Sequence, residues 1–371
     1  MRVLLPLLFA LVPNLPQHQS IDGPSVHWTA PGIFDPSLPP CWALRRTRGS
    51  LCAITSDGAF WLDATSSSYA ASMGEDEPGS VLLDATSWDK RSTEVWRGRD
   101  GLLHVSADIG DGWRPRPIPP ELQPATDAAA PPARAVISGY GDVLVLCAYG
   151  AIFRFERGTW SRLPIQLRGR ALEHRADRAL LVDRLLYLSL NSFDRGELIQ
   201  VDIDTGRALC ASDSFPEGAS CVRDLELGPD GRVYVTCGAP VMSTGGQLLV
   251  READGWRVML AAPVRIRPIL CGFALGDGTQ ASIPEPSEPN WTFLALAFDA
   301  QKRPCLLTEE EGILRRGMDE HWSCITPGWW SPEMGVSDLA IEGETAVFAS
   351  NRVGALRLNL STLEGWRLRT P

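Results

Sequence analysis

Apolar residues along this chain fall into short runs that are separated by turn-forming residues. Residues 133–166 show the pattern most clearly, because ARAVIS, DVLVLCA, AIFRFE and WSRLPIQ follow one another with glycine or charged residues between them. In AIFRFE, apolar and polar positions alternate, which is typical of a strand with two different faces. Asp230-Gly231 and Asp254-Gly255 stand where hairpin turns require positive φ angles. The pattern therefore predicts hairpins of short β-strands.

The same layout of strands recurs along most of the chain. Each unit has a glycine near the start of its third strand, and five units have a tryptophan 10 or 12 residues after that glycine. The glycines are Gly58, Gly101, Gly150, Gly196, Gly246, Gly312 and Gly354. The tryptophans are Trp113, Trp160, Trp256, Trp322 and Trp366. The glycines are spaced by about 49 residues on average, and a period of about 40–50 residues with four strands is typical of propeller blades.

We therefore expect an all-β fold, a seven-bladed β-propeller of four-stranded antiparallel blades. A single small sheet cannot bury both of its faces, whereas blades stacked around an axis bury each other, and the recurrent tryptophans are interpreted as packing between blades. The expected blades are 41–73, 79–118, 133–166, 170–212, 220–262, 292–325 and 336–370, within one domain over 41–371. The last blade is expected to end with its own outer strand. The ring closes either by packing of blade faces or by a strand from residues 1–34.

The composition and net charge of the chain argue against a helical fold and against nucleic-acid binding. The chain has 44% hydrophobic residues, 34 glycines and 29 prolines, which leaves little room for long helices. Its net charge is −10, so it lacks the basic footprint of a protein that neutralises phosphates, and no nucleic-acid partner is expected. The pairs Arg45–Arg46 and Arg315–Arg316 are interpreted as ordinary solvated edges.

Cysteines and the N-terminus point to different compartments. None of the nine cysteines forms a C-x-x-C motif, and several lie within apolar runs, so we expect buried free thiols and a reducing compartment. Residues 1–40 form a separate apolar segment. Met1–Val12 resembles a short signal peptide, but Pro6 interrupts it and no small-residue cleavage site follows. The cytoplasm is favoured over secretion or the periplasm, and no transmembrane span is expected.

The repeat resembles the seven-bladed WD40-like and YVTN-like propeller proteins, without pointing to a specific family. Residues 106–113 of the second unit, SADIGDGW, resemble an Asp-box, which in sialidase-like propellers is a structural turn. The resemblance implies a fold rather than a chemistry. Sialidases place an F-R-I-P segment before their first Asp-box, whereas the nearest string here, Arg265-Ile-Arg267-Pro268, lies far downstream.

Motifs for catalysis are missing from the sequence. It has no H-x-x-x-H, no G-x-S-x-G and no phosphate-binding loop, and we expect no cofactor and no metal. One enzymatic alternative is a metal-dependent hydrolase or lactonase at the channel mouth, because such propellers hold a cation through oxygen ligands. Its candidate ligands are Asn191, Glu197, Asp202 and Asp224.

Candidate binding residues lie in the long connections between blades, at 119–132, 263–291 and 326–335. Trp329 and Trp330 fall outside the repeat, and Trp291 and Met334 extend the same patch. Two interpretations stay open: these side chains anchor a partner, or they cover the channel mouth as a plug. The leading hypothesis is a monomeric, non-catalytic scaffold that binds a protein partner through its loop-rich face. A secreted carbohydrate-binding propeller is the third alternative.

Overall fold

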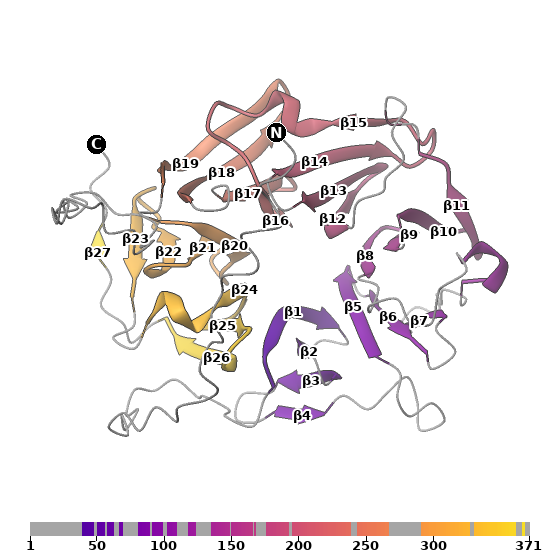
Figure 1. Cartoon of the computed structure of the whole chain (residues 1–371), viewed down its shortest axis with the longest axis horizontal. Helices are drawn as coiled ribbons and strands as arrows, with labels where there is room; N and C mark the ends of the chain where they lie inside the picture. The colour runs from indigo at the N-terminus through magenta and orange to yellow at the C-terminus, as the bar shows by residue number, and fades with distance from the viewer. Residues whose placement is uncertain are drawn as a thin grey trace, which may run out of the picture. The chain divides into compact units, whose positions relative to one another are not determined.

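The structure is a computed structural model, and the part of the chain that it describes is mainly β-strand. The described residues are 39–47, 50–55, 58–62, 67–69, 81–89, 91–98, 102–109, 118–123, 135–148, 150–165, 167, 176–192, 195–238, 243–266, 291–326, 330–360 and 366–367. They form seven antiparallel sheets arranged around a central axis (Figure 1). The predicted all-β, seven-bladed propeller is therefore confirmed.

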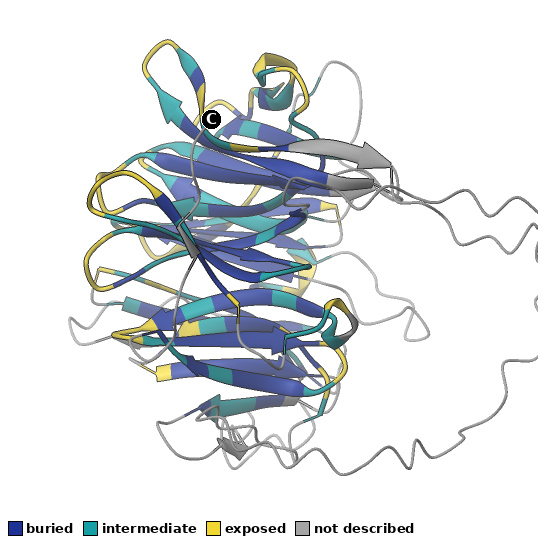
Figure 2. Ribbon diagram, turned by 90° about the vertical axis from the view of Figure 1, so that its left-hand side faces the viewer, coloured by how far each residue is buried: buried dark blue, intermediate teal, exposed yellow. Residues whose placement is uncertain are grey.

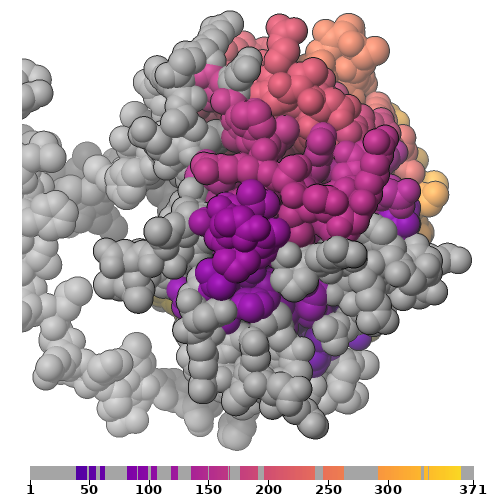
Figure 3. Space-filling view, turned by 90° about the vertical axis from the view of Figure 1, so that its right-hand side faces the viewer, coloured from indigo at the N-terminus to yellow at the C-terminus, as the bar shows by residue number. Residues whose placement is uncertain are grey.

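The first four blades follow the chain in order. Blade one has β1 (Cys41–Thr47), β2 (Ser50–Thr55), β3 (Gly58–Leu62) and β4 (Ser67–Tyr69). Blade two has β5 (Val81–Trp88), β6 (Arg91–Arg97) and β7 (Leu103–Ile109). Blade three has β8 (Ala135–Tyr140), β9 (Val143–Ala148), β10 (Ala151–Glu156) and β11 (Thr159–Leu163). Blade four has β12 (Ala176–Val182), β13 (Leu185–Ser192), β14 (Arg195–Asp202) and β15 (Ala208–Cys210). Blades two, three and four lie side by side along one flank, from purple to magenta in Figure 3.

The last three blades complete the circle. Blade five has β16 (Val222–Leu227), β17 (Val233–Gly238), β18 (Ser243–Glu252) and β19 (Gly255–Ile266). Blade six has β20 (Phe293–Phe298), β21 (Pro304–Thr308), β22 (Gly312–Arg316) and β23 (Trp322–Ile325). Blade seven has β24 (Val336–Glu342), β25 (Thr345–Ser350) and β26 (Gly354–Asn359). The first strand of each blade is its inner strand, and each inner strand contacts those of both neighbouring blades, including β24 with β1.

Tight turns set the register of the hairpins. Between β10 and β11, Arg157 and Gly158 both have positive φ angles, of 51° and 79°. Two such residues make a type I′ turn, whose twist matches that of the strands it joins. The pair Phe155–Trp160 then faces across the hairpin, with ring centroids 5.3 Å apart.

Three of the recurrent tryptophans pack between blades, whose strands are largely buried (dark blue in Figure 2). Trp160 of blade three packs in a cluster with Val95 and Leu103 of blade two. Trp256 of blade five packs against blade four, and Trp322 of blade six packs against blade five. Each of these outer-strand side chains therefore covers the face of the preceding blade. Trp113 lies outside the described residues.

Blades seven and one close the ring by packing of their faces. Leu44 and Leu51 of blade one share a cluster with Val347 and Ala349 of blade seven. In addition, the Ser337 hydroxyl donates to the carbonyl of Trp42, at 3.1 Å. The alternative closure by residues 1–34 lies outside the described residues.

The C-terminal strand departs from the prediction. β27 (Trp366–Arg367) pairs with β23 of blade six, opposite Ser323 and Cys324, and not with β26. The expected outer strand of blade seven is therefore wrong for this segment. A strand at the edge of a sheet offers unpaired backbone groups to any nearby segment, and the edge of blade six is the one that is used.

Eight of the nine cysteines lie in the described part of the chain, and all eight are free thiols. Burial raises the pKa of Cys41, Cys52 and Cys305 to about 12. These thiols behave as small apolar side chains within the blades. Among the described residues, no helix is long and apolar enough to cross a bilayer.

Candidate functional site

A shared irregularity in the inner strands brings polar side chains to the axis. Six of the seven inner strands skip one residue in their pairing with the second strand of the blade. Such a bulge re-aims the side chains around it. The residues that follow it are Ala43, Asp84, Arg178, Asp224, Ala295 and Asp338. Equivalent positions of four blades therefore carry charge.

The three aspartates each bind the backbone of the next blade in the same way. One carboxylate oxygen of Asp84 accepts from the amide of Ile137, at 2.9 Å. Asp224 accepts from the amide of Leu296, at 2.9 Å, and Asp338 from that of Leu44, at 3.0 Å. These bonds link blade two to three, five to six, and seven to one. A buried carboxylate that accepts an amide hydrogen bond keeps its charge at lower cost.

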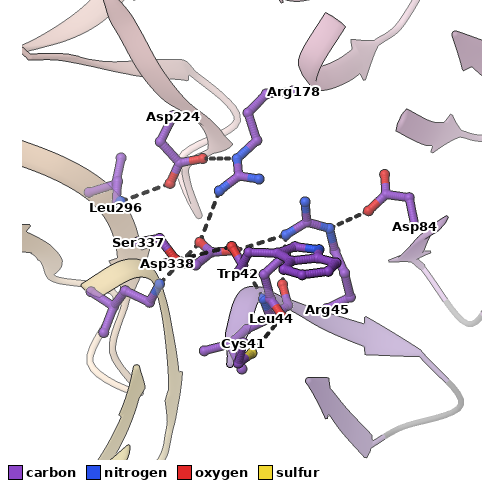
Figure 4. Close-up of polar contacts among 12 residues, drawn as sticks. Cys41, Trp42, Leu44, Arg45, Asp84, Arg178, Asp224, Leu296, Ser337 and Asp338 are labelled. Carbon is purple, nitrogen blue, oxygen red and sulfur yellow. Dashed lines mark hydrogen bonds and ion pairs between the residues drawn. The ribbon is translucent and has the colours of Figure 1, made fainter. Parts of the chain in front are cut away.

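Two arginines connect the three aspartates across the axis (Figure 4). Arg45 of blade one contacts Asp84 through Nε and Asp338 through Nη1, the latter at 2.9 Å. Arg178 of blade four contacts Asp224 at 2.9 Å and Asp338 at 3.1 Å. We call these five side chains the axial network. Together with the three backbone amides, it includes residues from all seven blades.

The axial network is shielded from water. The side chains of Arg45 and Arg178 are 17% and 18% exposed, and those of the aspartates are 4–6% exposed. Burial alone would lower the pKa of Arg45, but the negative charges of Asp84 and Asp338 raise it above its ordinary value. Asp338 and Asp224 raise the pKa of Arg178 in the same way. Both guanidinium groups therefore stay charged. The network has three aspartates for these two cations, and burial raises the pKa of Asp224 above its ordinary value despite its bonds to Arg178 and the amide of Leu296.

A cavity of about 530 Å³ lies on one side of the axial network. Residues of all seven inner strands line it. The lining extends from the axial network to residues next to the turn between the first and second strands of a blade, such as Asp89, Tyr140 and Leu227. None of the residues that precede the bulge lines it. The axial network therefore forms the floor of a cavity that extends toward the hairpin turns.

Glu226 lines the cavity two residues after Asp224. Burial, and then the negative charges of Asp224 and Asp338, raise its pKa to about 8, against the opposing effect of Arg178 and Arg45. Among the described residues, it makes no hydrogen bond or ion pair. Carboxyl groups with such shifted pKa values are concentrated at functional sites.

Trp42 marks the opposite end of the channel. It is the extra residue of the bulge in β1, and 44% of its surface is exposed. It does not line the cavity, and in Figure 4 its indole overlies the axial network in projection. This end of the inner strands is where the chain enters each blade, so Trp42 belongs to the face that carries the connections between blades.

The structure brings Trp330 and Met334 of the expected binding residues together and places Trp291 between other blades. The Trp330 indole N–H donates to the carbonyl of Glu309, at 3.2 Å, and its ring lies 5.4 Å from that of Phe348. Met334 packs in the same cluster between blades six and seven. Trp291 is buried between blades five and six, where it donates to Glu311 at 2.9 Å. Trp329 lies outside the described residues, and the binding role of the group stays a prediction.

Two of the candidate metal ligands, Asp224 and Asp202, lie in different surroundings. Asp224 belongs to the axial network, whereas Asp202 accepts the amides of Asp204 and Thr205 in its own turn, each at 2.9 Å. Within the described ranges, no group of three or more histidine, cysteine, aspartate or glutamate residues could hold a metal ion. The interpretation of Arg45 as a solvated edge is wrong, because the bulge in β1 turns this residue to the axis; Arg46 is 48% exposed, as expected.

Part of the axial network can be recognised from a repeated motif in the sequence. The string V-x-D-L occurs in two inner strands, as Val222–Leu225 and Val336–Leu339. Both aspartates are in the axial network. A search for residues repeated before the second strand of each unit could have found them, but not the two arginines.

Comparisons with known proteins agree on the fold. The extracellular domains of the two-component systems BT4673 and BT3049 of B. thetaiotaomicron are both 12% identical to this chain, with TM-scores of 0.55 and 0.53. The similarity covers 88% and 86% of this chain but only 39% and 40% of those domains, so the chain spans about two fifths of their length.

Virginiamycin B lyase of Staphylococcus aureus, in a catalytically inactive form with quinupristin, is 11% identical with a TM-score of 0.54. The similarity covers 89% of this chain and 98% of the lyase. No family model and no curated protein matches the sequence. The chain is thus a seven-bladed propeller, and at these identities the similarity extends to the fold alone.

Proposed function

We propose that this propeller is a non-catalytic scaffold that binds a protein partner through its loop-rich face, the end of the ring where the connections enter the inner strands. The observation that carries the proposal is Trp42. It is a large apolar side chain, 44% exposed, at the channel mouth of this face. Tryptophan is the residue type most enriched among those that dominate binding energy at interfaces.

The surroundings of Trp42 support a rigid anchor. Its backbone carbonyl is held by Ser337 of the neighbouring blade, and the following residues, Leu44 and Arg45, are bound to Asp338. A side chain on a fixed backbone loses little conformational entropy when it binds. The five charged side chains of the axial network are already paired with one another, so they support the ring and leave recognition to its faces.

A single substitution tests this proposal. Trp42→Ala should weaken the Kd for a partner at least about 30-fold, because a central aromatic anchor contributes 2 kcal/mol or more. Tagged protein is used to capture partners from a lysate of the source organism, and each partner is then purified and its Kd measured by calorimetry. The control is Met318→Ala, since Met318 is 82% exposed on the turn between β22 and β23, at the other end of the ring.

The outcome distinguishes the two faces. A partner that loses affinity for Trp42→Ala but binds Met318→Ala like the wild type supports the scaffold. Equal Kd values for the two variants, or no partner captured by the wild type, would overturn the proposal.

A further inference from the structure

The cavity beyond the axial network has the size and position of a small-molecule site. Its volume of about 530 Å³ falls within the range of ligand pockets, which is roughly 300–1,000 Å³. The seven inner strands that form its wall are tied together by the axial network, so the cavity is built into the rigid centre of the fold. This site is separate from the face that carries Trp42.

Charge decides which ligands the cavity can take. The axial network has three aspartates for two arginines, and Glu226 and Asp89 add two further carboxyl groups to the lining. Arg46, which also lines the cavity, is already engaged by Glu342 and by the carbonyl of Ile341. Among the described residues that line the cavity, carboxyl groups therefore outnumber guanidinium groups, and an anionic ligand would meet uncompensated carboxyl groups.

The wall of the cavity favours an organic cation over a metal ion. Partly exposed apolar residues supply part of the lining, among them Leu180, Leu227, Phe298 and Ala340. The aspartates of the axial network have their oxygens committed to arginines and amides. Of the other two carboxyl groups in the lining, Asp89 is exposed at a hairpin turn and Glu226 is partly buried beside the network, so Glu226 is the one placed to accept from an enclosed ligand. One carboxylate beside apolar walls suits an alkylammonium group, which needs one strong acceptor and apolar contact for its carbon chain.

We propose that this cavity binds a small organic ammonium compound, whose charged nitrogen donates to the Glu226 carboxylate and whose carbon chain lies along the apolar wall. Carboxylates of β16 and β24, Asp224 and Asp338, lie close enough to add attraction for the cation. The guanidinium groups of Arg178 and Arg45, on β12 and β1, oppose it but are neutralised by their own ion pairs.

Binding is coupled to loss of a proton. In the empty cavity, burial and the two aspartates raise the pKa of Glu226 to about 8, so the carboxyl group is largely protonated at neutral pH. A bound ammonium group stabilises the carboxylate, and the proton is released. The affinity should therefore rise by about 50-fold between pH 6 and pH 8, and by about a further twofold above pH 8 before it levels off.

Titration calorimetry with n-butylamine as the probe tests the proposal. Butyrate and butanol are the anionic and uncharged probes of similar length. We expect butylamine alone to bind, with release of close to one proton per site at pH 6.5, measured from heats in buffers of different ionisation enthalpy. Glu226→Gln should weaken the binding at least tenfold and remove its pH dependence.

Glu156→Gln is the matched control. Glu156 lies at the end of β10 in blade three, pairs with Arg184 of blade four and does not line the cavity. This variant should bind butylamine as the wild type does. The proposal is wrong if the wild type does not bind butylamine at millimolar concentration, if butyrate binds equally well, or if Glu226→Gln binds with unchanged affinity and pH dependence. Circular dichroism of each variant verifies the fold.

Discussion

Asp338→Asn should lower the free energy of unfolding by about 3 kcal/mol, because one substitution removes the charge that two buried arginines share. The carboxylate of Asp338 contacts Arg45 and Arg178 and accepts the amide of Leu44. In the variant, each guanidinium group keeps a single aspartate and loses its other charged partner. Denaturation followed by tryptophan fluorescence measures the change.

The matched control for Asp338→Asn is Glu342→Gln, four residues further along β24. Glu342 pairs with Arg46 at 3.1 Å, but both side chains are more than 40% exposed. Exposed ion pairs contribute up to about 1 kcal/mol, so the control should stay within that limit. Equal losses in the two variants would show that the axial network does not stabilise the ring more than a surface ion pair does.

Glu226→Gln should stabilise the protein at high pH, by an amount on the order of 2–4 kcal/mol at pH 9. The pKa of Glu226 is raised from 4.5 to about 8 in the folded state, since burial and two aspartates disfavour its charge. The folded protein therefore holds a proton that the unfolded chain releases, and the stability of the wild type falls as the pH rises from 4.5 to 8. Glutamine carries no charge at any pH and avoids this loss.

Denaturation of Glu226→Gln at pH 5, 7 and 9 measures the effect. The two proteins should be close in stability at pH 5 and diverge as the pH rises. Glu156→Gln is a control of opposite sign, because Arg184 holds the pKa of Glu156 below its ordinary value. That variant should not gain stability at high pH. A constant difference between Glu226→Gln and the wild type across the three pH values would contradict the assignment.

The sequence pattern predicted the blades because their signals are local. A strand, a turn and a glycine lie within a few residues of one another, and the tryptophans at positions 160, 256 and 322 recur at a fixed distance from that glycine. Each of these features reflects pairing with the adjacent strand or packing on the preceding blade. A repeated unit also shows its pattern several times, which makes it easy to recognise.

The axial network could not be predicted in the same way. Arg45 lies 39 residues from Asp84 and 293 residues from Asp338, so only closure of the ring brings them together. The bulge that directs Arg45 to the axis depends on the pairing of β1 with β2, and hydrophobic periodicity does not reveal it. The pairing of β27 with blade six could not be predicted for a related reason. A strand of two residues has no sequence pattern that indicates which sheet edge it joins.

The central claim is that the axial network acts as one unit across the blades. Arg45 and Arg178 belong to blades one and four and share Asp338. A double-mutant cycle with Arg45→Met, Arg178→Met and the double variant measures the coupling between them by denaturant unfolding. We expect a coupling energy of about 1 kcal/mol or more, because loss of either arginine changes the charge balance that the other depends on. Effects that add to within about 0.5 kcal/mol would contradict a single network.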